Sequence, residues 1–94
     1  MDAEHKRLEA IVHGYVQGVG FRWSTREVAR RLRLRGYVCN RWDRTVEVVA
    51  EGPEHALGQL LSFLEAGPSA ASVGRVDANW LPSRGEFYGF EVRF

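Results

Sequence analysis

The spacing of apolar residues switches repeatedly along this chain of 94 residues, and the order of the switches restricts the fold strongly. Apolar residues at every second position predict strands, and those at every third or fourth position predict helices. Strand-type spacing covers 8–14, 37–42, 45–51, 73–81 and, more briefly, 90–94. Helix-type spacing covers 24–34 and a segment that begins at Pro53, in which Leu57, Leu60, Leu61 and Leu64 share one face. The predicted order is therefore β-α-β-β-α-β with a short final strand.

Turn-forming and capping residues mark the boundaries of these elements. Ser24 and Glu27 have the spacing of a capping box, which places the start of the first helix at Ser24. A start two residues earlier would put Arg22 at the N-terminus of that helix. Gly36 is placed to end the helix as its C′ residue. The short Asp43–Arg44 break between two strand patterns predicts a hairpin.

This order of elements predicts an α+β fold. Two βα units that face one antiparallel hairpin form the split β-α-β, or ferredoxin-like, sandwich. We expect an antiparallel sheet with two helices on one face and right-handed crossovers. A chain of this length forms one small domain, so residues 1–94 are expected to fold together. The polar stretch 1–6 is expected to be a flexible tail.

Composition restricts the partners and the cellular location that we expect for the chain. The formal net charge is +1, which gives no general attraction to nucleic acid or anionic lipid. Cys39 is the single cysteine and has no internal disulfide partner, which favours a reducing, cytoplasmic location. No apolar run reaches membrane-spanning length, and 1–6 lack the apolar segment of a signal peptide. We therefore expect a free-standing cytoplasmic monomer that binds neither membrane nor nucleic acid.

The glycine-rich run from Gly14 to Arg22 is the clearest candidate for a functional site. It joins a predicted strand to a predicted helix, where backbone N–H groups and the positive end of the helix dipole converge. Glycine lets those N–H groups approach an anion, and the Arg22 guanidinium can grip two phosphate oxygens at once. The run lacks acidic residues, which favours an anion site over a tight connection whose arginine forms a surface ion pair. The sequence therefore predicts a phosphate cradle.

The cradle differs from the common nucleotide-binding motifs. It lacks the Gly-Lys-Ser/Thr ending of a P-loop, which gives no reason to expect ATP with magnesium. It also lacks the glycine spacing of a dinucleotide-binding fold.

The stretch from Val12 to Arg22 closely resembles the signature of the acylphosphatase family. The stretch from Gly36 to Asn40, followed by Val46 and Gly52 at the family's spacing, resembles that family too, and the resemblance continues to 90–94. It implies a ferredoxin-like fold. It also implies hydrolysis of a small-molecule acyl phosphate to a carboxylate and inorganic phosphate, without a metal or other cofactor.

The resemblance also implies roles for particular residues. Arg22 matches the family's phosphate-binding arginine, and Asn40 matches the asparagine that positions the attacking water. Inorganic phosphate or sulfate is then expected as a ligand or inhibitor. The predicted phosphate-binding residues, which contribute backbone amides and the Arg22 side chain, are Gln17, Gly18, Val19, Gly20, Phe21 and Arg22.

The residue types agree with that chemistry. The loop holds no cysteine, serine or histidine nucleophile, and nothing in the sequence marks a metal site. Such a site can act only by positioning and charge stabilisation. Acyl phosphates suit it because their leaving group is a carboxylate, with a pKa of about 4, that needs no general acid. The Asn40 amide can orient water but is no strong base, so a phosphoryl oxygen of the substrate is the hypothetical proton acceptor.

Two residues depart from the family pattern. Cys39 stands where a longer residue is usual. Strand alternation places it on the opposite face from Asn40, as a small apolar filler or a half-exposed thiol. Arg44 stands where the hairpin usually carries glycine, so the turn either avoids a positive φ or holds Arg44 under strain.

Two other functions compete with hydrolysis. One is a catalytically silent anion-binding domain of the same fold. The other is an RNA-binding module, which the arginine-rich stretch 26–35 favours. The missing aromatic continuation after Tyr37 and the near-neutral charge oppose it.

The tryptophans are expected to pack in the core or at its rim, with one of the first two lining the mouth of the site; they are Trp23, Trp42 and Trp80.

Overall fold

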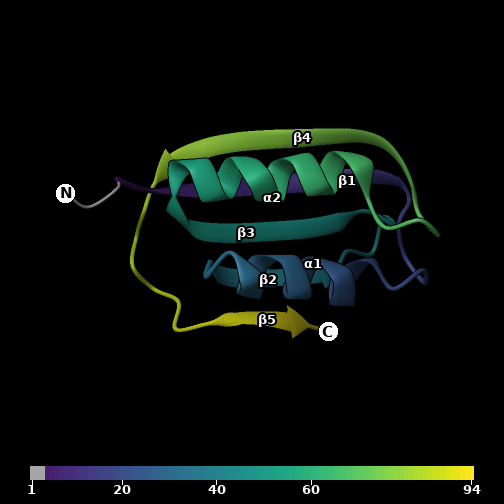
Figure 1. The fold of residues 1–94 in the computed structure, drawn as a ribbon. Coiled ribbons are helices and arrows are strands. Elements are labelled where there is room, and N and C mark those ends of the chain that lie inside the picture. Colours follow the sequence, from purple (N-terminus) through teal and green to yellow (C-terminus); the bar gives the residue numbers. More distant parts are fainter. Residues whose placement is uncertain (1–3) are drawn as a thin grey trace.

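The computed structural model describes residues 4–94 and contains one five-stranded sheet with two helices on one face (Figure 1). The strands lie in the order β4-β1-β3-β2-β5, so β1 and β3 are central. No helix among residues 4–94 is long and apolar enough to cross a membrane. The elements in chain order are β1 (His5–Tyr15), α1 (Phe21–Arg31), β2 (Arg35–Asn40), β3 (Val46–Pro53), α2 (Glu54–Ala66), β4 (Ser72–Pro82) and β5 (Phe90–Arg93).

The predicted ferredoxin-like fold is confirmed, with one difference in the sheet. The first four strands pair antiparallel as expected, but β5 pairs parallel with β2, so the sheet is mixed. The cause is the connection after β4. This segment, 83–89, crosses the end of the sheet where β2 begins, and β5 therefore enters from the same end as β2 (Figure 1).

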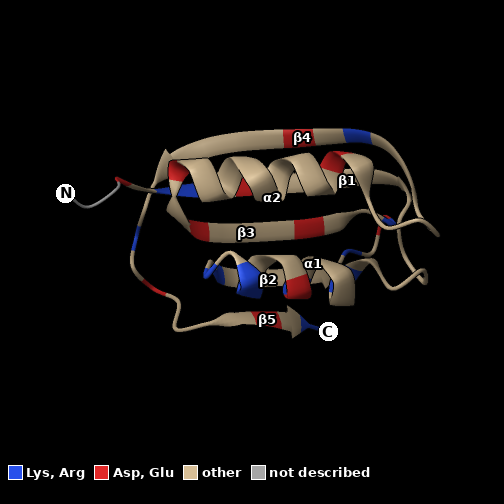
Figure 2. Cartoon of the chain, in the orientation of Figure 1, with Lys and Arg blue, Asp and Glu red and all other residues tan. Residues whose placement is uncertain are grey.

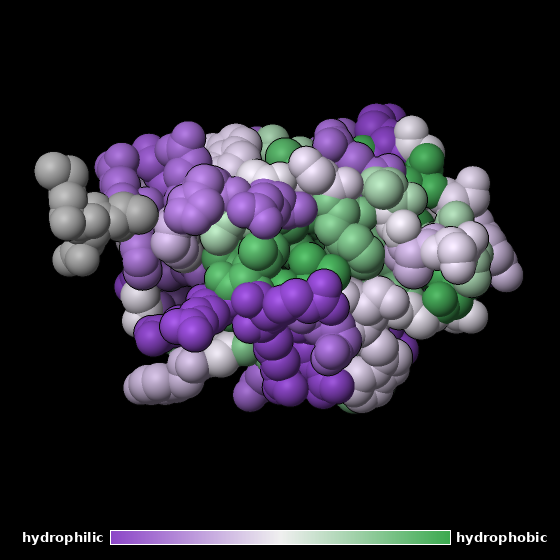
Figure 3. All heavy atoms as spheres, in the orientation of Figure 1, coloured by the Kyte–Doolittle hydropathy of each residue, from purple (hydrophilic) through white to green (hydrophobic). Residues whose placement is uncertain are grey.

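The core lies between the sheet and the two helices. Alternate residues of β1 and β3 point into it, as the strand patterns predict, and the leucine face of α2 covers them. Burying one leucine side chain contributes about 2 kcal/mol, so this layer supplies much of the driving force for folding. An apolar band is visible between the polar surfaces of the two helices (Figure 3). The buried residues of these three elements are Leu8, Ala10, Val12, Val46, Val48, Ala50, Ala56, Leu57, Leu60 and Leu64.

Helix α1 begins before the start that the capping box predicts and ends before the stop that Gly36 predicts. Its N-cap is Gly20, whose carbonyl accepts a hydrogen bond from the Ser24 amide, so the earlier of the two predicted starts is close to correct. The prediction that Gly36 ends the helix is wrong. Arg33 adopts the left-handed conformation (φ 60°), and the amides of Arg33 and Leu34 bond back to earlier carbonyls in a Schellman motif.

Gly36 has a different role within β2. Its backbone runs so close to β3 that a Cβ would overlap the Val49 carbonyl oxygen. The glycine therefore allows two strands to pair closely, and the sequence pattern alone does not distinguish this requirement from a helix stop.

The N-terminal boundary also differs from the expected tail. Strand β1 starts at His5, and His5 and Lys6 pair with Pro53 and Gly52 of β3. Residues 5 and 6 therefore belong to the sheet, and residues 1–3 of the expected tail lie outside the described residues. Pro53 is the N-cap of α2 and not its first helical residue.

A buried carboxylate fastens the β4–β5 connection to the sheet. Glu51 of β3 accepts hydrogen bonds from the Arg7 guanidinium (3.0 Å), the Ser83 hydroxyl (3.2 Å) and the amides of Arg84 (3.0 Å) and Gly85 (2.9 Å). Burial alone would raise the pKa of Glu51. The hydrogen bonds outweigh burial, and the pKa lies below its usual value of 4.5.

The variant Glu51→Gln tests this anchor. Because the folded-state pKa is lowered, the carboxylate stabilises the fold fully above about pH 4.5, and this contribution is lost as the pH falls through the folded-state pKa. We expect the variant to lose about 1–3 kcal/mol of unfolding free energy at neutral pH, with a smaller difference in acid. Urea denaturation over a pH series measures both. Glu65→Gln, on the exposed side of α2, is the control, and a difference independent of pH would contradict the prediction.

Candidate functional site

The glycine loop connects the end of β1 to the first turn of α1. Gly18 and Gly20 both have φ near +75°, a conformation that L side chains rarely adopt. The first turn of α1 carries no acidic residue, and Gly20 caps the helix through its backbone alone. The positive end of the α1 dipole is therefore not neutralised by a nearby carboxylate on the same helix, which suits an anion.

The strand register brings Asn40 to this loop. Val46 of β3 lies opposite Val12 of β1 on one side and opposite Asn40 of β2 on the other. Because paired residues share a face of the sheet, the Asn40 side chain points to the same side as the buried Val12 and Val46. This is the side on which α1 begins.

The loop, the helix start and the end of β2 enclose a hollow of about 230 Å³. The hollow brings together several of the sequence-predicted site residues. Gln17 and Val19 do not line it, although they belong to the same loop. The lining residues are Val16, Gly18, Gly20, Phe21, Arg22, Trp23 and Asn40.

Asn40 presents an unusual polar atom to this arrangement. Its Oδ1 is buried and has no hydrogen-bond partner among the described residues. A buried acceptor without a donor costs about 1–3 kcal/mol. Within 4–94 the Thr25 hydroxyl and Arg26 Nε are also buried without a partner, but neither residue lines the hollow. Asn40, which borders the hollow, therefore carries an acceptor with unused hydrogen-bonding capacity.

Arg22 projects from the first turn of α1 and is half-buried. Its guanidinium carbon lies 4.8 Å from the centre of the Phe94 ring, a cation–π contact with the last residue of the chain. None of the ion pairs formed within 4–94 involves Arg22. An aromatic ring thus supports the guanidinium without neutralising its charge.

The side chain of Gln17 links the loop to the β2–β3 hairpin. Its Nε2 donates hydrogen bonds to the carbonyl oxygens of Arg41 (2.8 Å) and Thr45 (2.9 Å). Asp43 Oδ1 accepts hydrogen bonds from the Thr45 amide and hydroxyl inside the same turn. The hairpin that follows Asn40 is therefore tied to the loop that contains Gly18 and Gly20.

The two departures from the family pattern lie outside the hollow. Cys39 is on the other face of the sheet, and its Sγ lies 3.5 Å from Glu47 Oε1. Burial and this carboxylate raise the pKa of the thiol, which favours the neutral form. Arg44 adopts a positive φ of 72°, so the strained alternative is the correct one.

Two of the three tryptophans lie at the rim of the core, one of the two placements expected, and Trp42 lies outside it. Trp23 and Trp80 are about half exposed, and Trp42 is 92% exposed. Trp23 lines the hollow with Arg22, and Trp42 lines a second hollow of about 450 Å³ on the Gln17 side of the loop. The core is filled by aliphatic residues and two phenylalanines. Trp80 pairs with the buried Leu8 but lies on the edge strand β4, Trp23 lies in the first turn of α1, and Trp42 follows β2.

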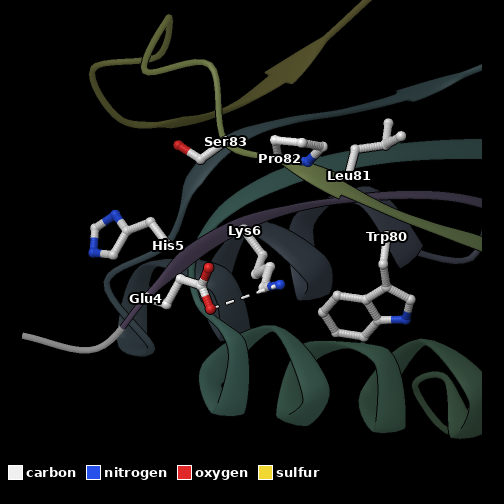
Figure 4. Close-up of a pocket in the computed structure, with 7 residues that line it drawn as sticks. All are labelled: Glu4, His5, Lys6, Trp80, Leu81, Pro82 and Ser83. Carbon is white, nitrogen blue, oxygen red and sulfur yellow. Dashed lines mark ion pairs between the residues drawn. The ribbon is translucent and has the colours of Figure 1, made fainter.

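A larger hollow, of about 480 Å³, contains none of the predicted site residues. It lies between the start of β1 and the end of β4, with Trp80 and Lys6 facing it (Figure 4). Within 4–94, no group of three His, Cys, Asp or Glu side chains is placed to hold a metal ion.

Two contacts of the site were not predicted from the sequence. Gln17 was expected to bind phosphate through its backbone amide, and no contact was predicted for its side chain, which bonds the hairpin. Phe94 was expected only as part of a strand. The alternation of Phe90, Val92 and Phe94 predicted the strand but not that its last side chain meets Arg22.

Comparisons with known proteins show similarity in sequence and fold over nearly the whole chain. A sequence model of the acylphosphatase family matches residues 8–92. An acylphosphatase of Nocardia farcinica is 48% identical over 87 residues, covering 93% of this chain and 87% of the relative. One of Mycobacterium tuberculosis is 46% identical over 93 residues, covering 99% of this chain and 100% of the relative. The crystal structure of acylphosphatase from Bacillus subtilis has a TM-score of 0.91 at 34% identity, covering 95% of this chain and 99% of that chain.

The fold and the hollow define a ferredoxin-like domain with a glycine-rich loop between a strand and a helix. The extent of the match goes further than the fold, because it spans nearly the whole chain at high identity. The chain belongs to the acylphosphatase family and is a hydrolase. The resemblance noted from Val12 to Arg22 is thereby confirmed.

The variant Gln17→Met tests the link between loop and hairpin. Methionine keeps the length of the side chain but donates no hydrogen bond to the Arg41 and Thr45 carbonyls. We expect a loss of about 1–2 kcal/mol in unfolding free energy and faster amide exchange across the hairpin. Gln59→Met, at an exposed position of α2, is the matched control. Equal effects of the two substitutions would show that the link does not matter.

Proposed function

We propose that the enzyme hydrolyses the carboxyl–phosphate bond of acyl phosphates in the hollow between the glycine loop and Asn40. One observation carries the proposal: the same hollow is lined by Arg22, whose guanidinium has no carboxylate partner within 4–94, and by Asn40, whose buried amide oxygen has no donor there. The first group suits an anion, and the second suits a water molecule. Family membership supports the same substrate class.

In this proposal the loop and Arg22 hold the phosphoryl group. The backbone amides from Gln17 to Arg22 donate hydrogen bonds to its equatorial oxygens, and the Arg22 fork spans two of them. Charge gathers on these oxygens in a loose transition state, where preorganised donors are most effective. Inorganic phosphate and sulfate present the same tetrahedral oxygens, so both are expected to compete with substrate.

Asn40 holds the attacking water. The water donates one hydrogen bond to Oδ1, and its oxygen attacks phosphorus in line with the leaving carboxylate. A new P–O bond forms, the P–O bond to the acyl group breaks, and the carboxylate leaves with the bonding electrons. The second proton of the water passes to a phosphoryl oxygen, so the products are a carboxylate and inorganic phosphate.

The proposed reaction uses no metal ion and no cofactor. A carboxylate with a pKa of about 4 leaves without a general acid. The charge that a metal would neutralise is met by Arg22 and the row of amides. All the proposed groups come from one chain, so a monomer is sufficient for the reaction.

Asn40 also argues against a silent anion-binding domain. An anion would be bound by the Nδ2 donors of the Asn40 amide, so anion binding alone leaves the acceptor oxygen without a role. A water molecule between the amide oxygen and the phosphoryl group reconciles the two, because it donates to Oδ1 and presents its lone pair to phosphorus. Hydrolysis therefore accounts for both features of the hollow.

The variants Arg22→Ala and Asn40→Ala separate the two proposed roles. We expect kcat/KM for acetyl phosphate to fall about a thousandfold or more in Arg22→Ala, which corresponds to roughly 3–4 kcal/mol. Competitive inhibition by inorganic phosphate should disappear with it. Asn40→Ala should lower kcat by about a hundredfold or more and keep phosphate inhibition, since the cradle is intact. Steady-state kinetics in the presence of a chelator measure all four quantities.

Arg31→Ala serves as the control because Arg31 lies at the exposed C-terminal end of α1. Its kinetics should match those of the unmodified enzyme. If Arg22→Ala and Asn40→Ala were as active as this control, or if the unmodified enzyme were inactive with the chelator, the proposal would be wrong.

A further inference from the structure

A second group of arginines lies at the end of the molecule opposite the cradle. Strand β2 ends at Asn40 beside the cradle and begins at Arg35, about 17 Å away. Two hollows of about 360 Å³ each meet there and share Arg33 and Arg35 as lining residues, with Arg30 in one of them. Figure 2 shows blue segments at this end of α1 and β2. We call the two hollows together the arginine groove.

The arginines of this groove are not neutralised within the described chain. Among residues 4–94, neither Arg30, Arg33 nor Arg35 takes part in an ion pair. Arg30 is stabilised by the negative end of the α1 dipole, and its Nε also donates a hydrogen bond to the Phe90 carbonyl (3.1 Å). The dipole does not account for Arg35, which begins a strand.

Arg33 occupies a position where arginine is unfavourable for the fold. It is the left-handed residue after α1, with φ 60°, a place where glycine is usual. A side chain in this conformation costs roughly 1–2 kcal/mol. Glycine would therefore adopt this backbone conformation at a lower energy than Arg33. What arginine adds at this position is a guanidinium in the groove.

The surroundings of the groove favour a short ligand over a long polymer. His5 and His55 line one hollow, and the exposed Tyr88 lines the other. Carboxylates also border it: Glu91 lines the second hollow, and Glu51 lines the first with its oxygens already bonded. Because these carboxylates line the groove itself, a polyanion that followed its whole length would meet them, whereas a short one placed at Arg33 and Arg35 would contact mainly the arginines.

We propose that the arginine groove is a second anion site that binds a small molecule carrying two or more linked phosphate groups. Arg33 and Arg35 lie where the two hollows meet, so one ligand can contact both guanidiniums. Linked phosphates match this geometry because each guanidinium fork grips two oxygens of one group. The site is independent of the cradle and of the hydrolytic reaction.

Isothermal titration calorimetry with inorganic tripolyphosphate tests this site in the Arg22→Ala variant, in which the cradle is impaired. We expect one bound tripolyphosphate per chain and amide shifts in NMR spectra around 30–35 and 85–91. Adenosine triphosphate without metal forms a second arm. Tighter binding of the nucleotide indicates an organic oligophosphate as the ligand, and equal binding indicates recognition of the phosphates alone. Either result supports the site.

Two matched substitutions locate the binding. Arg33→Gly and Arg44→Gly each remove one arginine and one positive φ at a non-glycine residue, but only Arg33 lies in the groove. We expect Arg33→Gly to keep or raise the Tm and to weaken tripolyphosphate binding at least about tenfold. Arg44→Gly should leave the binding unchanged, and Arg35→Gln should weaken it as Arg33→Gly does.

Three results would overturn the proposal. They are no measurable binding of either oligophosphate, binding that is equal in Arg33→Gly and Arg44→Gly, and tighter binding of single-stranded RNA than of tripolyphosphate. The last would identify the groove as part of a nucleic-acid surface.

Discussion

The pairing of β3 with its two neighbours fixes where the groups of the site meet. Val12, Val46 and Asn40 form one row across β1, β3 and β2. A slip of one residue in the β2–β3 pairing would turn Asn40 to the face that carries no helix. The glycine loop follows β1 shortly after Val12, so the same register places the loop beside Asn40. Gln17 then fastens this arrangement by bonding the hairpin between β2 and β3.

Buried polar groups at one end of the sheet have all their hydrogen-bond partners within the described chain, whereas those at the other end lack some of them. The buried Glu51 has all its hydrogen bonds supplied by the chain, and it holds the β4–β5 connection. Asn40 Oδ1 is left without a donor and Arg22 without a carboxylate within the described residues. Leaving such groups unpaired lowers stability, and the apolar layer between sheet and helices offsets it. Glu51, with all its hydrogen bonds supplied by the chain, anchors a connection. Asn40 and Arg22 keep the bonding capacity that the proposed ligand would use.

The sequence predicted most of the elements because their apolar spacing is determined by burial on one face. It predicted Arg22 and Asn40 as partners through resemblance, and the structure places both in one hollow. The predicted end of α1 was wrong because glycine is the usual residue after a helix, and Gly36 lies only three residues beyond Arg33. The structure uses Arg33 for that position, and Gly36 is required where β2 approaches β3. The contacts of Gln17 and Phe94 depend on segments far apart in the chain, and no local pattern carries that information.

The glycines of the loop need a reason beyond their backbone conformation. A Cβ at Gly18 or Gly20 would meet nothing within 4 Å, so crowding by the protein does not require glycine there. A positive φ alone does not require it either, since Arg33 and Arg44 tolerate φ values of 60° and 72° at roughly 1–2 kcal/mol each. Both glycines line the hollow that also holds Arg22 and Asn40. Under the proposed function, glycine at these positions lets a phosphoryl group approach the backbone amides.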